Sequence, residues 1–121
     1  MQKYILVVVV SMMFWNCSSQ ENSSSITTKD LEVLILKKEL QLLDVRTPKE
    51  IEQGYIKGAK FSNYFESDFT AQVAKKFDSE KTIYVYCRSG NRSLKAVKIL
   101  TSKGFKAINV LGGYDAWKSA Q

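Results

Sequence analysis

The sequence predicts one α/β domain, in which a central, mostly parallel sheet of about five short strands carries helices on both faces. Two observations lead to this prediction. From residue 27 onward, short apolar runs alternate with amphipathic segments of helical spacing, which is the pattern of strand–helix–strand units. The chain has 121 residues, of which 45% are hydrophobic and 25% are charged, as in an ordinary soluble domain.

Helices are predicted where apolar residues recur with helical spacing between capping signals. Thr27 and Asp30 stand at capping-box spacing and start the first helix, which continues to about Lys38. Thr47 precedes a proline and opens the second helix, with Glu50 three residues after it as a capping residue, and Gly54 ends this helix. The remaining helices are expected at 67–77, 93–103 and 114–120.

Strands are predicted at the short apolar runs between these helices. The clearest is Thr82–Cys87, which is rich in β-branched and aromatic residues. Tyr84 and Tyr86 in this strand are interpreted as packing residues. Leu40–Val45 is short and apolar, as expected of a buried strand. Two further strands are expected at 60–63 and 107–111. In such folds, ligands bind beyond the carboxyl ends of the parallel strands.

The N-terminal segment is expected to lie outside this domain. Residues 1–16 combine a single lysine with an apolar run that is too short to span a membrane, which is typical of a secretory signal peptide. Cys17 follows at once, and residues 17–26 read as a polar, serine-rich tether to a domain at 27–121.

A cysteine directly after such a segment resembles the lipidation site of bacterial lipoproteins. The resemblance implies that Cys17 carries a lipid and that the protein is exported to the bacterial cell envelope or periplasm and anchored to a membrane. A plain secretory signal, an uncleaved N-terminal anchor and a cytoplasmic protein are the alternatives.

Composition restricts the chemistry that the chain can perform. It has no histidine and two cysteines, so most zinc sites are excluded and neither a metal nor a cofactor is expected. Catalytic arrangements that use histidine as a base are excluded for the same reason. The net charge of +6 suits an anionic partner. A membrane-surface role for this charge is an alternative if the chain is lipidated, although no basic cluster stands out. No aromatic–basic platform indicates nucleic-acid binding.

The loop after the clearest strand has the composition of a reactive cysteine site. Cys87 ends that strand, and Arg88, Gly90 and Arg92 follow before the next helix begins. A helix N-terminus and nearby cations both lower the pKa of a thiol, so Cys87 can act as a nucleophile without histidine. Gly90 allows the backbone to turn successive amides inward. A buried, inert strand-end cysteine is the alternative interpretation.

This loop is one of four segments that together resemble the rhodanese family of sulfurtransferases. The resemblance extends over about residues 27–120, essentially the whole domain, and implies a rhodanese-like fold. In chain order, the segments are Leu42–Glu50, Gly54–Ala59, Cys87–Ser93, and Leu111–Gly113 with Trp117. Tyr55 and Lys57 stand where the family has histidine and proline.

The resemblance implies a reaction in two halves, with Cys87 as the catalytic residue. Its thiolate takes the outer sulfur of a small anionic donor such as thiosulfate. The resulting persulfide passes that sulfur to a thiophilic acceptor, such as cyanide or a thiol, including a thiol of a partner protein. The implied substrate-binding residues are Arg88, Ser89, Gly90, Asn91, Arg92 and Ser93. Arg88 and Arg92 supply positive charge, with fixation of the loop as an alternative role for Arg92.

Asp44 and Arg46 are interpreted as structural residues that tie a strand end to neighbouring loops. An acid or base role for Asp44 is the alternative.

Two other functions compete with sulfur transfer. A phosphatase of the same fold would need five residues between Cys87 and Arg92, where this chain has four. A non-enzymatic module that carries or senses a persulfide, or docks a partner, would keep the same loop.

Overall fold

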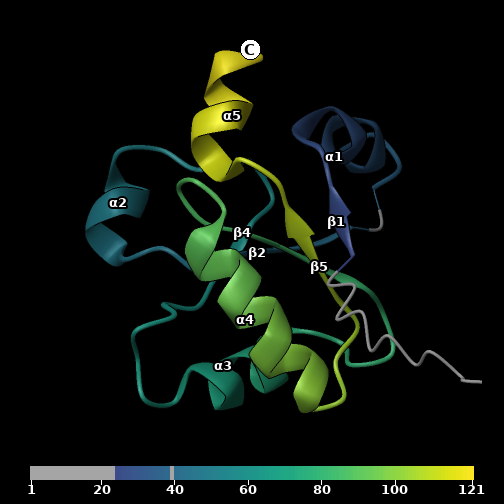
Figure 1. Ribbon diagram of the computed structural model, residues 1–121, viewed down its shortest axis with the longest axis vertical. Helices are drawn as coiled ribbons and strands as arrows, with labels where there is room; N and C mark the ends of the chain where they lie inside the picture. Colours follow the sequence, from purple (N-terminus) through teal and green to yellow (C-terminus); the bar gives the residue numbers. More distant parts are fainter. Residues whose placement is uncertain (1–23, 39) are drawn as a thin grey trace, which may run out of the picture.

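A computed structural model describes residues 24–38 and 40–121 of the chain. The elements are, in chain order, β1 (Ser25–Ile26), α1 (Thr28–Ile35), β2 (Gln41–Asp44), α2 (Pro48–Glu52), β3 (Lys60–Phe61), α3 (Phe69–Lys76), β4 (Ile83–Tyr86), α4 (Asn91–Ser102), β5 (Ala107–Val110) and α5 (Gly113–Ser119). Figure 1 shows their arrangement. None of the helices in the described ranges is long and apolar enough to cross a membrane.

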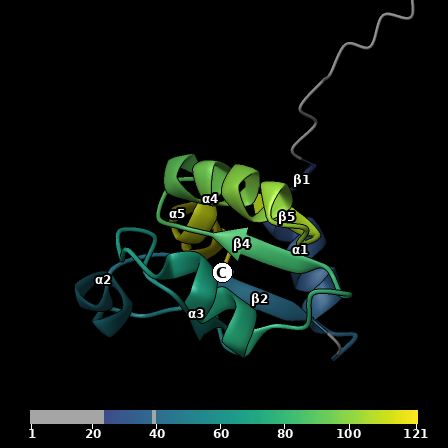
Figure 2. The same ribbon diagram turned by 90° about the horizontal axis from the view of Figure 1, so that it is seen from below.

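The five strands form one parallel sheet in the order β1-β5-β4-β2-β3. This confirms the predicted α/β class and the parallel sheet. Tyr84 of β4 lies opposite Leu42 of β2 and Ile108 of β5, so β4 is paired along both edges. Because every strand runs the same way, all carboxyl ends meet at one edge of the sheet. The loop after β4 starts from that edge (Figure 2).

Side chains of alternate strand positions bury two separate apolar clusters, one on each face of the sheet. Val85 points toward α3 and α4, where it packs with Val73 and Leu100. Its neighbour Tyr86 points to the other face and packs with Leu31 of α1. Tyr114 and Trp117 of α5 cover this second cluster. Helices on both faces therefore agree with the prediction.

Two capping boxes were predictable from spacing alone, and both are present. The Thr27 hydroxyl accepts a hydrogen bond from the Asp30 amide, and the Asp30 carboxylate accepts one from the Thr27 amide. Thr47 and Glu50 make the same pair of bonds at the start of α2. These bonds satisfy amides that have no partner within the helix, so each helix begins where the sequence indicated.

The strand β1 differs from the predicted organisation. Ser25 and Ile26 were assigned to the tether that ends at residue 26, but they pair with Asn109 and Val110 of β5. The Asn109 amide donates to the Ser24 carbonyl, and the Leu111 amide donates to the Ile26 carbonyl. This pairing covers the outer edge of β5. A two-residue strand is too short to show a period in the sequence.

Candidate active site

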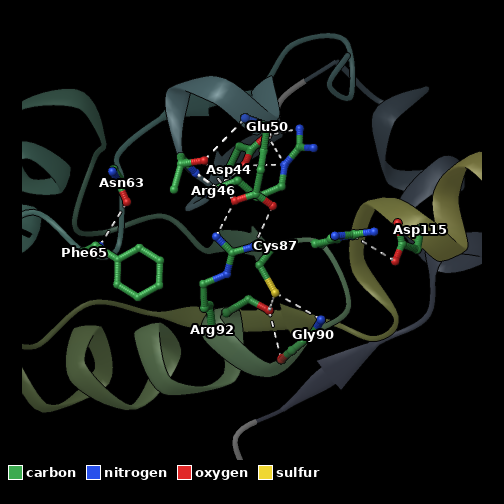
Figure 3. A network of polar contacts seen from close by, with 12 residues as sticks. Asp44, Arg46, Glu50, Asn63, Phe65, Cys87, Gly90, Arg92 and Asp115 are labelled. Carbon is green, nitrogen blue, oxygen red and sulfur yellow. Dashed lines mark hydrogen bonds and ion pairs between the residues drawn. The ribbon is translucent and has the colours of Figure 1, made fainter. Parts of the chain in front are cut away.

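Cys87 lies directly after β4, at the carboxyl edge of the sheet. Its side chain is 1% exposed and belongs to the apolar cluster beneath α3 and α4. The thiol is nevertheless not an inert core group, because the backbone curls around it. The Gly90 amide donates a hydrogen bond to Sγ at 3.0 Å, as Figure 3 shows. The loop therefore folds back onto the sulfur as its composition predicted.

Gly90 makes this turn possible. Its φ is 110°, in the left-handed region that favours glycine, and it is the N-cap of α4. The helix begins at Asn91, two residues before the predicted start at Ser93. Asn91, Arg92 and Ser93 are therefore residues of the first helical turn rather than of a loop, and their amides belong to the N-terminus that faces the sulfur.

The other side of the loop is held by α5. The amides of Tyr114 and Asp115 donate to the carbonyl oxygens of Cys87 and Arg88, at 2.8 and 3.0 Å. A side chain at Gly113 would collide with these two carbonyls. The carbonyl groups of the loop therefore bind the amides of α5, while the Gly90 amide of the same loop binds the sulfur. This explains why a glycine stands at position 113.

Ser93 is the closest polar side chain to the thiol. Its Oγ lies 3.3 Å from Cys87 Sγ and 3.1 Å from the Gly90 carbonyl. A hydroxyl has one proton to donate. When Ser93 donates to the carbonyl, the Cys87 thiol can donate to Oγ. When Cys87 is ionised, the hydroxyl proton can turn toward the thiolate instead.

The pKa of Cys87 is lowered from its ordinary value. Burial acts to raise it, but the Ser93 hydroxyl and the backbone amides of Ser93, Gly90 and Ser89 donate hydrogen bonds that favour the thiolate. The direction agrees with the prediction of a reactive thiol. The hydrogen bonds come from the loop and from the helix start, which was one of the two predicted causes. Of the two arginines named as the other cause, Arg92 interacts electrostatically with Cys87.

Arg92 forms a paired contact with Glu50 of α2. Its two terminal nitrogens donate to the two carboxylate oxygens, each at 2.7 Å, which is the bidentate geometry of strong arginine–carboxylate pairs. The Arg92 bonds hold the pKa of Glu50 at about 2, against the smaller opposing effect of burial. Arg92 thus ties α4 to α2. The alternative role expected for Arg92 was to fix the loop by internal hydrogen bonds, whereas the partner in the structure is a carboxylate on another helix.

Arg88 is mostly exposed, and its Nε lies 3.6 Å from the carboxylate of Asp115 in α5. Next to it is a hollow of about 180 Å³ between α2, the loop and α5. Arg88 and Lys118 line this hollow together with Glu50 and Asp115, so it presents both signs of charge. The side chains of Ser89 and Asn91 are exposed, and only the backbone of Ser89 contributes to the environment of the thiol.

Asp44 and Arg46 form a buried pair beside the loop. Asp44 Oδ2 accepts from an Arg46 terminal nitrogen at 2.7 Å, and the Arg46 backbone amide donates to Oδ1. The same arginine donates to the Gly54 carbonyl at 2.8 Å and stacks on the Tyr114 ring. These contacts join the end of β2 to the segment after α2 and to α5, which fits a structural role.

Two residues that complete this arrangement were not predicted as site residues. Glu50 was interpreted only as a capping residue, and that role concealed its pairing with Arg92. Tyr86 was expected to be a packing residue; its hydroxyl also accepts from the Ile56 amide. Burial and the neighbouring Asp44 raise the Tyr86 pKa. The alternation of side chains along β4 predicts which face of the sheet Tyr86 occupies, but it does not predict the hydrogen-bond partner of the Tyr86 hydroxyl.

The predicted lipidation site, Cys17, lies outside the described residues.

Comparison with known proteins places this geometry in a family. Residues 27–120 match the family described as Rhodanese-like domain. The chain is 40% identical over 85 residues to thiosulfate sulfurtransferase 16 of Arabidopsis thaliana, covering 62% of this chain and 71% of that protein. It is 36% identical over 80 residues to a putative sulfurtransferase, YtwF, of Bacillus subtilis, covering 66% and 75% of the two chains. A rhodanese-like domain protein from Staphylococcus aureus has a similar solved structure, with a TM-score of 0.70, 38% identity, and coverage of 78% of this chain and 90% of that chain.

Proposed function

Because the chain belongs to the rhodanese-like domain family, we propose that it moves a sulfane sulfur from thiosulfate, through a Cys87 persulfide, to a thiophilic acceptor. The sulfurtransferases among its relatives support sulfur transfer in general. The identity of the donor, thiosulfate, and the use of a thiophilic acceptor are the parts that we propose. The observation that carries it is the convergence of the Gly90 amide and the Ser93 hydroxyl on the Cys87 sulfur.

In the first half-reaction, the Cys87 thiolate attacks the outer sulfur of thiosulfate. A new sulfur–sulfur bond forms to Cys87, the sulfur–sulfur bond of thiosulfate breaks, and sulfite leaves with the electron pair. The amides from Arg88 to Ser93 stabilise the transferred sulfur and the departing anion, since donors fixed in advance need no reorganisation during the reaction. The lowered pKa of Cys87 supplies the nucleophile.

In the second half-reaction, the acceptor attacks the outer sulfur of the persulfide, and the Cys87 thiolate leaves. Cyanide yields thiocyanate, and a thiolate yields a new persulfide. The same hydrogen bonds that favour the Cys87 thiolate favour it as the leaving group. The exposed Arg88 lines the neighbouring hollow together with Lys118 and offers positive charge to an anionic donor or acceptor.

The intact mass of the protein tests this proposal directly. After excess thiosulfate, the chain is expected to gain the mass of one sulfur atom and to lose it again with cyanide. The Cys87→Ser variant is expected to gain nothing. A sulfur that is gained but not released to any acceptor would indicate a carrier module instead of an enzyme. No gain from thiosulfate but a gain from polysulfide would overturn the proposed donor.

We also propose that the protein is exported and is attached to a membrane by a lipid on Cys17. The support is the sequence pattern of residues 1–17. Labelling of growing bacteria with a palmitate analogue is expected to mark the full chain and to leave the Cys17→Ser variant unmarked. Labelling of both, or of neither, would contradict lipidation at Cys17.

A further inference from the structure

We propose that the edge of the sheet opposite the Cys87 loop docks on an anionic lipid surface. The docking face is a set of four exposed lysines around Leu40, called the basic edge here: Lys37, Lys38, Lys57 and Lys81. The choice of a lipid partner rests on the membrane attachment proposed above.

The topology places the basic edge and the catalytic loop at opposite ends of the domain. All strands are parallel, so their amino ends share one edge and their carboxyl ends share the other. Lys37 and Lys38 follow α1 just before β2, and Lys81 lies just before β4. In Figures 1 and 2 the turn before β4 is at the right of the sheet, and the loop after β4 is at the left.

The described chain begins at the same edge as the lysines. Ser24 precedes β1, whose amino end lies beside the amino end of β5. Seven peptide steps separate Ser24 from Cys17, a distance of at most about 25 Å even for an extended chain. A lipid on Cys17 therefore limits how far the amino end of β1, and the edge that it shares with the lysines, can lie from the bilayer surface.

Charge at this edge complements an anionic surface. The four lysines of the basic edge make no ion pair with another described residue. Lys103 and Lys106 add positive charge in the turn before β5. Asp78 and Glu80 add negative charge in the turn before β4, and Glu39 stands between Lys38 and Leu40 in the sequence. Lysines near an anionic bilayer each strengthen binding, and the effect is confined to about a Debye length.

The surface between the lysines is hollowed and partly apolar. A hollow of about 240 Å³ is lined by Ile35, Leu40 and Leu42, with Lys38 and Lys57 at its rim. A second hollow of about 390 Å³ is lined by Leu34, Leu40 and Tyr84, with Lys37 and Lys81.

Leu36 stands in the sequence between Ile35 and Lys37, which line these hollows. Its side chain is 76% exposed. The lysine ammonium groups can bind the anionic phosphate of a phospholipid, and the apolar side chains that line the hollows can contact the upper part of its acyl chain. In this orientation the Cys87 loop faces the aqueous phase, open to soluble donors and acceptors.

Lysine acetylation of the full chain on vesicles tests the docking. The protein is mixed with an excess of phosphatidylcholine vesicles, with or without phosphatidylglycerol, and treated with a water-soluble acetylating reagent. The lysines of the basic edge are expected to react at least about threefold more slowly on the anionic vesicles. High salt is expected to remove this protection. Equal rates on both kinds of vesicle would overturn the proposal.

A matched pair of fourfold variants gives the control. Changing the basic edge to glutamine (K37Q, K38Q, K57Q and K81Q) is expected to reduce binding of the protein to anionic vesicles by at least about tenfold relative to neutral ones. Removing four exposed lysines from the other end (K29Q, K49Q, K95Q and K118Q) is expected to have a much smaller effect. An equal loss in both variants would indicate a general effect of net charge and would refute the docking face.

Two further readouts separate this proposal from those it rests on. The intact mass reports whether Cys17 carries a lipid, while acetylation reports docking whether or not it does. Sulfur gain from thiosulfate is expected to be unchanged in the basic-edge variant, because these lysines lie at the opposite edge from Cys87.

Discussion

At the scale of single residues, the ionisation of Cys87 is coupled to the hydroxyl group of Ser93. Ser93 Oγ lies within hydrogen-bond distance of both Sγ and the Gly90 carbonyl. Burial of the thiol alone would favour its neutral form. The Ser93 hydroxyl is the largest of the contributions that oppose burial and lower the Cys87 pKa. Arg88 and Arg92 form ion pairs with Asp115 and Glu50, and Arg92 also interacts electrostatically with Cys87.

The Ser93→Ala variant is expected to have a higher Cys87 pKa. Hydrogen bonds to charged groups contribute about 1.5–3 kcal/mol, so alkylation of Cys87 below the midpoint of its titration should slow by roughly tenfold or more. The measurement is the rate of iodoacetamide reaction as a function of pH. Ser89→Ala is the control, since the Ser89 side chain is exposed and its amide is retained. Superimposable profiles for wild type and Ser93→Ala would show that the hydroxyl does not stabilise the thiolate.

The pair between Glu50 and Arg92 predicts a specific dependence of stability on pH. The Glu50 pKa of about 2 lies below the value of about 4.3 for an unfolded chain. The pair therefore stabilises the fold above about pH 5, and this contribution is lost as the pH falls toward 2. Both side chains are partly exposed, which limits the contribution to about 2 kcal/mol.

The Glu50→Gln variant is accordingly expected to be less stable than wild type by about 2 kcal/mol at pH 6, with a difference that shrinks toward pH 2. Urea unfolding at several pH values measures this. Glu52→Gln, an exposed neighbour in the same helix, is expected to have little effect. A difference that stayed constant between pH 6 and pH 2 would exclude Glu50 as the titrating group.

At the scale of elements, the site is a junction of three helices around one loop. The N-terminus of α4 faces the sulfur, α5 holds the loop carbonyls, and α2 is joined to α4 through Arg92 and Glu50. Gly113 lies where α5 meets the loop, with a φ of 56°. A Cβ there would meet the carbonyls of Cys87 and Arg88, so the loop would have to move.

Gly113→Ala is therefore expected to slow persulfide formation as well as to destabilise the fold. Gly104→Ala is the matched control. Its φ of 93° is also left-handed, but the space around it is open, so it is expected to cost only the conformational strain of about 1–2 kcal/mol. The rate of sulfur gain by mass and the free energy of unfolding are measured for both. Unchanged sulfur gain in Gly113→Ala would show that α5 does not position the loop.

At the scale of the whole molecule, two apolar clusters share one five-stranded sheet. Leu100 of α4 is fully buried on one face and Leu31 of α1 on the other. Because alternate residues of β2 and β4 supply both clusters, weakening either face weakens the same strands. A domain of this size has a total stability of about 5–15 kcal/mol, so the loss of one leucine on either face is a large fraction of it.

Leu31→Ala and Leu100→Ala are each expected to lower the free energy of unfolding by about 2–5 kcal/mol and to leave a single cooperative transition. Leu36→Ala, at an exposed position, is expected to change it by less than about 0.5 kcal/mol. Denaturant unfolding followed by both fluorescence and circular dichroism measures this. Separate transitions in one of the buried variants would show that the two faces unfold independently.

The sequence by itself determined the α/β class, the parallel sheet, the capping of α1 and α2, and a cysteine loop at the carboxyl edge. Each of these depends on residues close together in the chain: apolar period, capping spacing, and the order of strand, glycine and helix. Thr47 and Glu50 illustrate this, since a spacing of three residues was sufficient to predict their hydrogen bonds.

The tertiary structure decided every contact between segments that are distant in the chain. The pairing of Glu50 with Arg92 joins residues 42 positions apart, and no local pattern contains it. The edge strand β1 exists because β5 offers it unpaired amides. The lysines of the basic edge are scattered from Lys37 to Lys81 and form no run in the sequence. They share one edge because parallel strands bring all the turns that precede them to the same end of the sheet.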